Sequence, residues 1–285
     1  MPKLIPTTSK DAAAASTGLD YVLIAGAPIS DVTMDTAVER LKSWVSSKGS
    51  KYICVADVHS VMRARRDPSH EMALRNADMV TPDGQPLSWV SALLGRPAMR
   101  RVCGPDLMLR LIDDGRDLGW RHFLYGGTED VVRNLKVRLE SLYPGVHIVG
   151  AYSPPFRDLT PAEDDQVVQM IRRTTPNIVW VGLGCPKQER WAMTHSERLP
   201  RTVLIGVGAA FDFHAGAIAR APRVFQRLGV EWLHRLVHSP RRLWRRYLID
   251  APQFVMISAA EIFKRNTLKF TAISQGRDSS EQSAQ

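Results

Sequence analysis

The chain has 285 residues, of which 44% are hydrophobic and 24% are charged, and its formal net charge is +9 at pH 7. This size and composition indicate a globular protein with a sizeable core, and no apolar run approaches the roughly 20 residues that a membrane-spanning helix needs. The three cysteines lie far apart and indicate neither a zinc site nor a disulfide framework, whereas the positive charge implies an anionic partner: nucleic acid, anionic lipid or a phosphorylated substrate.

Composition divides the chain into four parts. Residues 1–18 lack the apolar segment of a secretory signal. We expect them to form a short disordered leader. An α/β core is predicted over 19–218 and a basic, amphipathic helical appendage over 219–272. The polar tail, 273–285, is again expected to be disordered. The cysteine usage and the absence of a signal favour a cytoplasmic location.

The first part of the core is predicted to alternate strands and helices. Short runs rich in β-branched and aromatic residues predict strands at 21–25, 51–58 and 79–80, with a turn at Gly26-Ala27-Pro28 after the first. Thr36 and Glu39 have the spacing of a capping box, which predicts the start of a helix.

Polar side chains stand where two of these strands are expected to end. Asp57 and His59 follow the second strand, and Asp83 lies in a Pro-Asp-Gly sequence after the third. Pro and Gly around an aspartate are an ordinary turn signal, and a lone histidine is more often structural than catalytic. Further on, Asp106 is placed to cap a helix that begins at Leu107.

A βαβ unit is predicted between residues 121 and 149. Its first strand ends at Gly126-Gly127, a helix with a regular apolar face follows over 129–142, and a Tyr-Pro-Gly sequence stops that helix before the second strand. A glycine pair at such a turn is a common site for phosphate or ribose binding.

The stretch 177–216 contains two apolar strands, each followed by glycines and polar residues. The first strand ends at a Gly-Leu-Gly turn that includes Gly184, and Gln188 lies at the start of the next helix. The second strand also ends at a glycine, and Asp212 follows. Strand ends of this kind bind ligands in open α/β sheets. We therefore expect a Rossmann-like, mostly parallel sheet with helices on both faces and a binding site at this edge.

The C-terminal part is basic, and many of its arginines fall between Arg220 and Arg246, around apolar and aromatic positions. Three interpretations are open: a solvated face of ordinary helices, a nucleic-acid-binding surface, and an appendage that lies on an anionic membrane. We favour the membrane surface over the ordinary solvated face, because basic amphipathic helices with Trp and Phe tend to lie on anionic membranes. Nucleic acid fits the charge, but no nucleic-acid-binding motif accompanies it. The apolar faces of these helices would also suit a second copy of the chain, as a homo-oligomer.

Five motifs in order resemble the WecG/TagA/CpsF glycosyltransferases (glycosyltransferase family 26): VGLGCPKQE, IGVGAAFDFHAG, RAP, EWLHRL and PRRLWRRYL. The resemblance extends from about Tyr21 to Phe254. Those bacterial enzymes transfer a sugar from a UDP-sugar to a lipid-linked or polysaccharide-precursor acceptor. The resemblance implies an inverting hexosyltransferase that acts on a polyprenyl-pyrophosphate-linked acceptor in cell-surface polysaccharide or exopolysaccharide synthesis. It would work as a peripheral protein at the inner face of the cell membrane.

The resemblance also implies roles for individual residues. Asp83 occupies the place of the aspartate in a matching P-D-G turn, which is the family's proposed catalytic base. Arg101, with Arg100 as a substitute, matches the arginine of an R-x-x-G-x-D segment that would face the donor diphosphate. The C-terminal arginines that would steady the diphosphate are Arg220, Arg235, Arg241 and Arg242. The residues that would shape the nucleotide and sugar pocket are Gly126, Gly127, Gly184, Gln188 and Asp212. The candidate contacts to acceptor or sugar are Asp57, His59 (a second-choice base) and Asp106.

No metal and no cofactor is expected. Many UDP-sugar enzymes hold a divalent metal on an Asp-x-Asp motif, which this sequence lacks; arginines and helix N-termini would take its place. Val55 and Asp57 stand where the family commonly has T-x-N, which makes a glucose or glucuronate type of donor more plausible than the usual N-acetylmannosamine type. The alternative function is a non-catalytic basic module that binds nucleic acid or anionic lipid. A dinucleotide oxidoreductase is disfavoured, because no G-x-G-x-x-G follows a strand.

Overall fold

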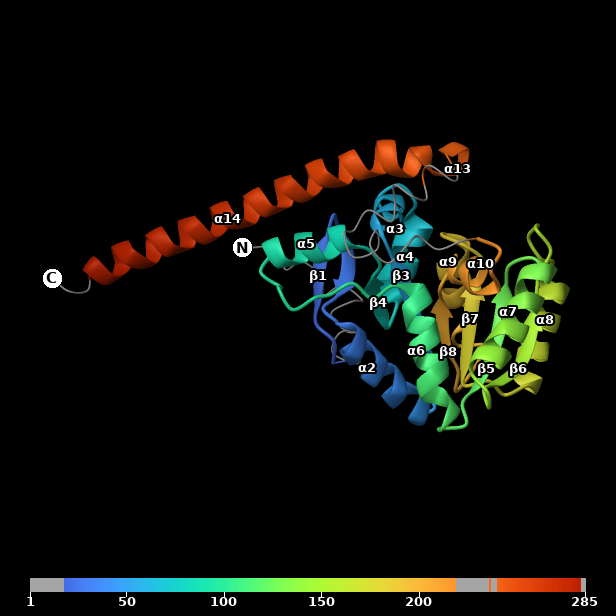
Figure 1. Cartoon of the computed structure of the whole chain (residues 1–285). Helices are drawn as coiled ribbons and strands as arrows, with labels where there is room; N and C mark the ends of the chain where they lie inside the picture. The colour runs from blue at the N-terminus through green and yellow to red at the C-terminus, as the bar shows by residue number, and fades with distance from the viewer. Residues whose placement is uncertain (1–17, 219–235, 237–239, 283–285) are drawn as a thin grey trace.

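A six-stranded sheet forms the centre of the part of the protein that the structure describes (Figure 1). The computed structural model describes residues 18–218, 236 and 240–282. The strand order is β4-β3-β8-β7-β5-β6, and every neighbouring pair is parallel, so the predicted Rossmann-like parallel sheet is confirmed. The strands are β3 (Lys51–Ala56), β4 (Met79–Pro82), β5 (Arg121–Gly126), β6 (His147–Tyr152), β7 (Ile178–Gly182) and β8 (Val203–Gly206).

Apolar side chains are buried on both faces of the sheet, which explains why its strands read as continuous apolar runs. In β7, Val179 and Val181 belong to one buried cluster, and Ile178 and Trp180 belong to the other. The helices that contribute to the first cluster include α3 (Val58–Ala64), α4 (Pro68–Asn76), α8 (Pro161–Arg173) and α9 (Lys187–His195). Those that contribute to the second include α2 (Met34–Ser46), α6 (Gly104–Arg116), α7 (Glu129–Leu142) and α10 (Ala210–Ala215).

The N-terminal strand pairs outside the main sheet. β1 (Tyr21–Ile24) and β2 (Ala27–Ser30) form an antiparallel hairpin. The predicted turn at Gly26-Ala27-Pro28 is wrong, because Ala25 and Gly26 make the turn with φ angles of 48° and 85°. Positive φ at both central residues suits a two-residue hairpin. The Val80 backbone N–H donates to Ser30 Oγ at 3.0 Å and ties the hairpin to β4.

Two helices begin near their predicted starts with different caps. Thr33 caps α2 and forms the capping box with Thr36, so the predicted pair of Thr36 and Glu39 is wrong by about one turn. The N-cap residue of α6 is Cys103, so Asp106 lies inside the first turn and does not cap the helix as predicted. A carboxylate there still interacts favourably with the positive end of the helix dipole.

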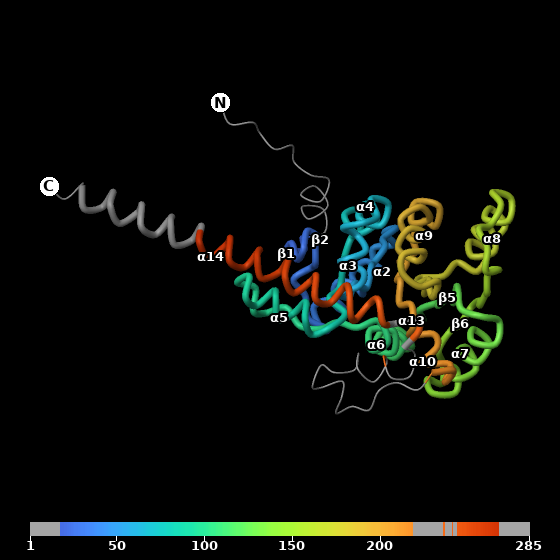
Figure 2. The backbone as a smooth tube through the Cα atoms, turned by 90° about the horizontal axis from the view of Figure 1, so that it is seen from above, coloured from blue at the N-terminus to red at the C-terminus, as the bar shows by residue number. Residues whose placement is uncertain are grey.

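The predicted helical C-terminal part is confirmed for the described residues, and it lies across the core (Figure 2). It comprises α13 (Pro240–Arg245), a π-helical turn η1 (Arg246–Asp250) and α14 (Ala251–Gln282). α14 contacts α3 and α5 (Gln85–Leu93), and Phe254 is buried in the first core cluster. Glu261 Oε2 accepts a hydrogen bond from the Ala25 backbone N–H at 2.9 Å. Among the described residues, no helix has both the length and the apolar character that a membrane span requires.

Candidate active site

The predicted site residues of the core follow the carboxyl ends of the parallel strands. Because all six strands run the same way, these ends share one edge of the sheet. Asp57 follows β3 and Asp83 follows β4. The residues that end or follow the other strands are Gly126 and Gly127 at β5, Gly184 and Gln188 after β7, and Asp212 in α10 after β8.

Two glycine turns meet where the chain connections diverge. The connection that leaves β5 leads to β6 on one side, and the connection that leaves β7 leads to β8 on the other, so β5 and β7 flank a topological switch point. Gly126 has a φ of 123°, and a Cβ there would lie 2.5 Å from the carbonyl carbon of Gly182, so only glycine fits. The Gly127 backbone N–H donates to Gly182 O at 3.1 Å. Gly184, with φ 77°, faces open space.

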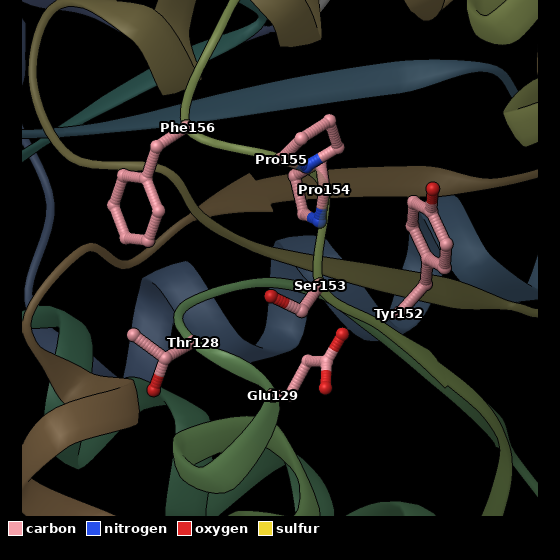
Figure 3. A pocket seen from close by; sticks show the side chains of 7 residues that line it. All are labelled: Thr128, Glu129, Tyr152, Ser153, Pro154, Pro155 and Phe156. Atoms are coloured by element: carbon pink, nitrogen blue, oxygen red, sulfur yellow. The ribbon is translucent and has the colours of Figure 1, made fainter.

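A pocket of about 360 Å³ lies beside the Gly127 turn (Figure 3). Ser153, directly after β6, donates its hydroxyl to Gly127 O at 2.7 Å and fixes this wall. Phe156, at the rim of this pocket, is 89% exposed. The sequence analysis did not single out Phe156. The Pro-Pro-Phe sequence after a predicted strand end is the feature that could have drawn attention to it. The lining residues are Thr128, Glu129, Tyr152, Ser153, Pro154, Pro155 and Phe156.

A carboxylate and a guanidinium group meet at the end of β4. The Asp83 backbone N–H donates to Ala56 O at 2.7 Å, and the Val102 N–H donates to Pro82 O at 2.8 Å, so both segments are fixed to strand ends. Arg101 Nη2 lies 3.7 Å from Asp83 Oδ1. Both side chains keep some solvent access, 19% for Arg101 and 31% for Asp83. The structure thus brings together the residues predicted as base and diphosphate ligand.

The first turn of α6 adds a second acidic group. Cys103 Sγ donates to Asp106 Oδ2 at 2.9 Å. Burial raises the pKa of the Cys103 thiol above its ordinary value, and the nearby carboxylates of Asp83 and Asp106 act in the same direction. These residues therefore form one electrostatic group, in which the thiol stays protonated and hydrogen-bonded at neutral pH.

The C-terminal part reaches this edge of the sheet through charged contacts. Asp57 caps α3 by accepting from the Ser60 N–H at 2.9 Å, and its other oxygen forms an ion pair with Arg246. His59 Nδ1 lies 2.7 Å from Asp250 Oδ2, so His59 contacts the appendage. Burial lowers the pKa of Arg246 below its ordinary value. Arg246 was not among the candidate residues, although the run PRRLWRRYL contains it.

Of the other predicted arginines, only the side chain of Arg241 is among the described ones. Arg220 and Arg235 lie outside the described residues, as does the side chain of Arg242. Arg241 is exposed at the start of α13. Asp212 lies in the first turn of α10, and its carbonyl accepts from the N–H groups of 217 and 218. α10 packs against α6 and α7, so Asp212 stands between the β4 and β5 sides of the edge.

One group of potential metal ligands occurs among the described residues. The ligand atoms of His70, Cys185 and Glu189 lie within 4.8 Å of one another. His70 Nε2 already lies 3.0 Å from Ser60 Oγ, and burial raises the pKa of the Cys185 thiol. A metal needs the thiolate form, so this group suits a hydrogen-bonded cluster better than a metal centre.

The sequence model of the glycosyl transferase WecG/TagA/CpsF family matches residues 22–268. An N-acetylglucosaminyldiphosphoundecaprenol N-acetyl-beta-D-mannosaminyltransferase of Bacillus spizizenii is 33% identical over 209 residues, which cover 73% of this chain and 78% of the relative. A protein of the same description from Staphylococcus aureus is 30% identical over 224 residues, 78% of this chain and 86% of the relative. The chain therefore belongs to the WecG/TagA/CpsF family of glycosyltransferases.

Proposed function

We propose that this glycosyltransferase transfers a sugar from a UDP-sugar to a polyprenyl-pyrophosphate-linked acceptor in the synthesis of a bacterial cell-surface polysaccharide. The printed names of the relatives describe an undecaprenyl diphosphate acceptor that carries N-acetylglucosamine. The observation that carries the proposal is the pairing of Asp83 with Arg101 at the end of β4, next to the Asp57–Arg246 ion pair. A carboxylate beside one guanidinium group, with a second guanidinium group at the end of the neighbouring strand, suits a reaction that removes a proton and releases a diphosphate.

In the proposed mechanism, the acceptor hydroxyl attacks the anomeric carbon directly. Its proton passes to the Asp83 carboxylate, the new C–O bond forms, and the bond between the anomeric carbon and the diphosphate oxygen breaks with its electron pair on UDP. Direct displacement inverts the configuration at that carbon. Arg101 and Arg246 supply fixed positive charge and planar donor groups for the departing diphosphate. This role needs no metal ion, in keeping with the lack of an Asp-x-Asp motif.

The nucleotide end of the donor is assigned to the β5–β7 side of the edge. The β7 turn faces open space at Gly184, and the pocket beside Gly127 carries the exposed ring of Phe156. The donor sugar is then of the N-acetylmannosamine type, as in the names of the relatives, or of the glucose type. Asp57 favours the second, because an ion-paired carboxylate replaces the neutral amide of the common pattern.

Purified protein incubated with radiolabelled UDP-sugars and a polyprenyl-pyrophosphate-linked N-acetylglucosamine acceptor, in the presence of EDTA, tests the proposal. Wild type is expected to transfer one of the sugars. Asp83→Asn should lower kcat by about 10²- to 10⁴-fold, because an amide cannot take the proton. UDP should still raise the melting temperature of the variant. A variant with a near-normal rate would show that Asp83 is not the base, and EDTA-sensitive transfer would reject metal independence.

We further propose that the appendage lies on the anionic inner face of the membrane. Its described part combines exposed apolar residues with basic ones: Trp244, Leu248, Val255, Met256 and Phe263 beside Arg241, Arg245 and Lys264. Such a surface binds anionic bilayers by shallow burial together with charge. The protein should sediment with phosphatidylglycerol vesicles and less with phosphatidylcholine vesicles, and Phe263→Asp with Met256→Asp should reduce binding about tenfold or more. Binding to duplex DNA with equal strength would favour the nucleic-acid alternative, and a stable dimer that hides these residues would favour self-association.

A further inference from the structure

Two adjacent polar residues at the start of α9 are buried. Gln188 is 4% exposed and Glu189 is 1% exposed. A buried polar side chain destabilises a fold unless its atoms find partners, and a buried carboxyl group is especially costly. α9 follows the Gly184 turn and packs against β7, β8 and β3, so its first turn lies at the sheet edge that carries the site.

The amide of Gln188 is fixed by close packing against β8 and the turn that follows. A Cβ on Gly206 would lie 3.2 Å from Gln188 Cγ and 3.3 Å from both Cδ and Nε2. A Cβ on Gly208 would lie 3.4 Å from Gln188 Oε1. Both positions are glycines, and the amide occupies the space that larger residues would fill. The amide plane is thus held over the end of β8, with its oxygen toward Gly208.

Glu189 determines which end of this amide faces the sheet edge. Gln188 Nε2 donates to Glu189 Oε1 at 2.9 Å. While Glu189 is ionised, its oxygens only accept, so a flipped amide would place two acceptor oxygens against each other. Gln188 Oε1 is left buried and without a hydrogen-bond partner among the described residues. A buried acceptor in this state is satisfied when a ligand N–H or O–H reaches it.

The second carboxyl oxygen of Glu189 has no hydrogen-bond partner among the described residues. This oxygen, Oε2, lies 4.0 Å from His70 Nδ1, beyond hydrogen-bond distance. Burial raises the pKa of Glu189 to about 7 and lowers that of His70 to about 4. His59 on α3 and Arg190 on α9 face Glu189 and oppose the effect of burial on its pKa, and the Cys185 thiol lies on the preceding loop. Among the described side chains, Gln188 is the one that donates a hydrogen bond to this carboxyl group.

We propose that Glu189 is a positioning residue, which orients the Gln188 amide so that Gln188 Oε1 accepts a hydrogen bond from a hydroxyl or N–H group of the UDP-sugar. The inference rests on the proposed function. It adds Glu189, which does not touch the substrate itself but determines whether Gln188 presents its amide oxygen or its amide nitrogen to the substrate. The accepting oxygen lies beside Gly208, between the β7 turn and α10, so the sugar or ribose hydroxyl groups are the donors within its reach.

A double-mutant cycle tests the inference. Gln188→Ala and Glu189→Ala should each lower kcat/KM for the UDP-sugar by about tenfold or more, the usual effect of losing one oriented hydrogen bond to a substrate. The double variant should be no worse than Gln188→Ala alone, because Glu189 acts only through Gln188. Glu189→Gln should recover activity to within about threefold of wild type, because its amide oxygen still accepts from Gln188 Nε2.

The controls separate positioning from a purely structural role. Glu163→Ala removes the capping box of α8 and should lower the melting temperature without changing kcat/KM. If Glu189→Ala does not fold, Glu189→Met, which keeps the volume without an acceptor, replaces it. Additive losses in the cycle, or an unchanged rate in Glu189→Ala, would overturn the inference and leave the proposed function standing. If wild type transfers no sugar from any UDP-sugar while Asp83→Asn and Glu189→Ala both fold, the proposed function and this inference fail together.

Discussion

The α/β core and the C-terminal part differ in how far charged contacts hold them in place. The core is built on strands whose side chains are buried on both faces, such as Trp180 and Val179 in β7. The C-terminal part packs Phe254 on the core and adds charged contacts: Arg246 pairs with Asp57, and Asp250 accepts from Arg66 at 2.7 Å. Apolar packing is tight and insensitive to salt, whereas ion pairs respond to pH, ionic strength and ligands.

This difference has a consequence for the site. Asp83 and the glycine turns belong to the core and keep their geometry as long as the sheet is folded. Arg246 belongs to the C-terminal part, and its place beside Asp57 depends on the polar attachment. Of the two arginines proposed to stabilise the departing diphosphate, Arg101 is fixed in the core, whereas Arg246 leaves the site if the C-terminal part detaches. The protein would then become fully active only when the C-terminal part is docked.

Lowering the pH should weaken the core through its buried histidines, and this is the largest effect we expect. Trp180 Nε1 donates to His122 Nδ1 at 3.2 Å, which requires a neutral ring. Burial lowers the pKa of His122 from 6.5 to about 3. The unfolded chain therefore binds a proton that the folded one excludes, and stability is lost as the pH falls below 6.5. The loss of folding stability is at most a few kcal/mol, because each pKa unit corresponds to about 1.4 kcal/mol.

Urea unfolding between pH 7.5 and 5 measures this effect, and His122→Asn should flatten the pH dependence of the free energy of unfolding. Glu189 acts in the opposite sense, because burial raises its pKa to about 7 and its contribution to stability declines as the pH rises from 4.5 to 7. Because wild type and His122→Asn both contain Glu189, its contribution cancels in the difference between their free energies of unfolding. An unchanged slope in the variant would show that His122 is not the source.

Much of the core could be predicted from the sequence, because a strand that is buried on both faces appears as a continuous apolar run. Strands at 51–58 and 178–181 appear as apolar runs, and the glycines after the second indicate the edge at which the site is predicted. The hairpin and the strand order could not be predicted, because they depend on which edges pair. The two-residue turn at Ala25-Gly26 was missed because Pro28, taken as a turn residue, lies in a short strand.

Within the described part of the chain, Arg246 is the C-terminal arginine that reaches the candidate site, and it could not be identified from the sequence for a geometrical reason. The run PRRLWRRYL offers four arginines, and helical phase decides which of them faces the core. η1 begins at Arg246, and a π-helical turn contains more residues than an α-helical one, so the phase shifts within the run. A regular 3.6-residue period therefore does not single out Arg246. The contact with Asp57 depended on a turn that no composition rule predicts.

Removing Asp250 should detach the C-terminal part while leaving the core folded. Its carboxylate is 5% exposed and contacts both Arg66 and His59. Because Arg66 is 46% exposed, we expect docking to weaken by only about 1–3 kcal/mol in Asp250→Ala, less than for a fully buried pair. Hydrogen exchange in α14 should accelerate, trypsin should release the C-terminal part sooner, and sugar transfer should fall with the loss of Arg246 from the site.

The matched control is Asp130→Ala, which removes an exposed ion pair within α7, far from the C-terminal part. It should change neither hydrogen exchange in α14 nor the rate of transfer. The unfolding transition of the core in Asp250→Ala should stay within about 1 kcal/mol of wild type, since Phe254 is the one fully buried apolar side chain that α14 contributes among the described residues. If the stability of the core falls together with the hydrogen-exchange protection of α14, the two regions unfold as one unit. Arg246 would then be as firmly held as the arginine of the core.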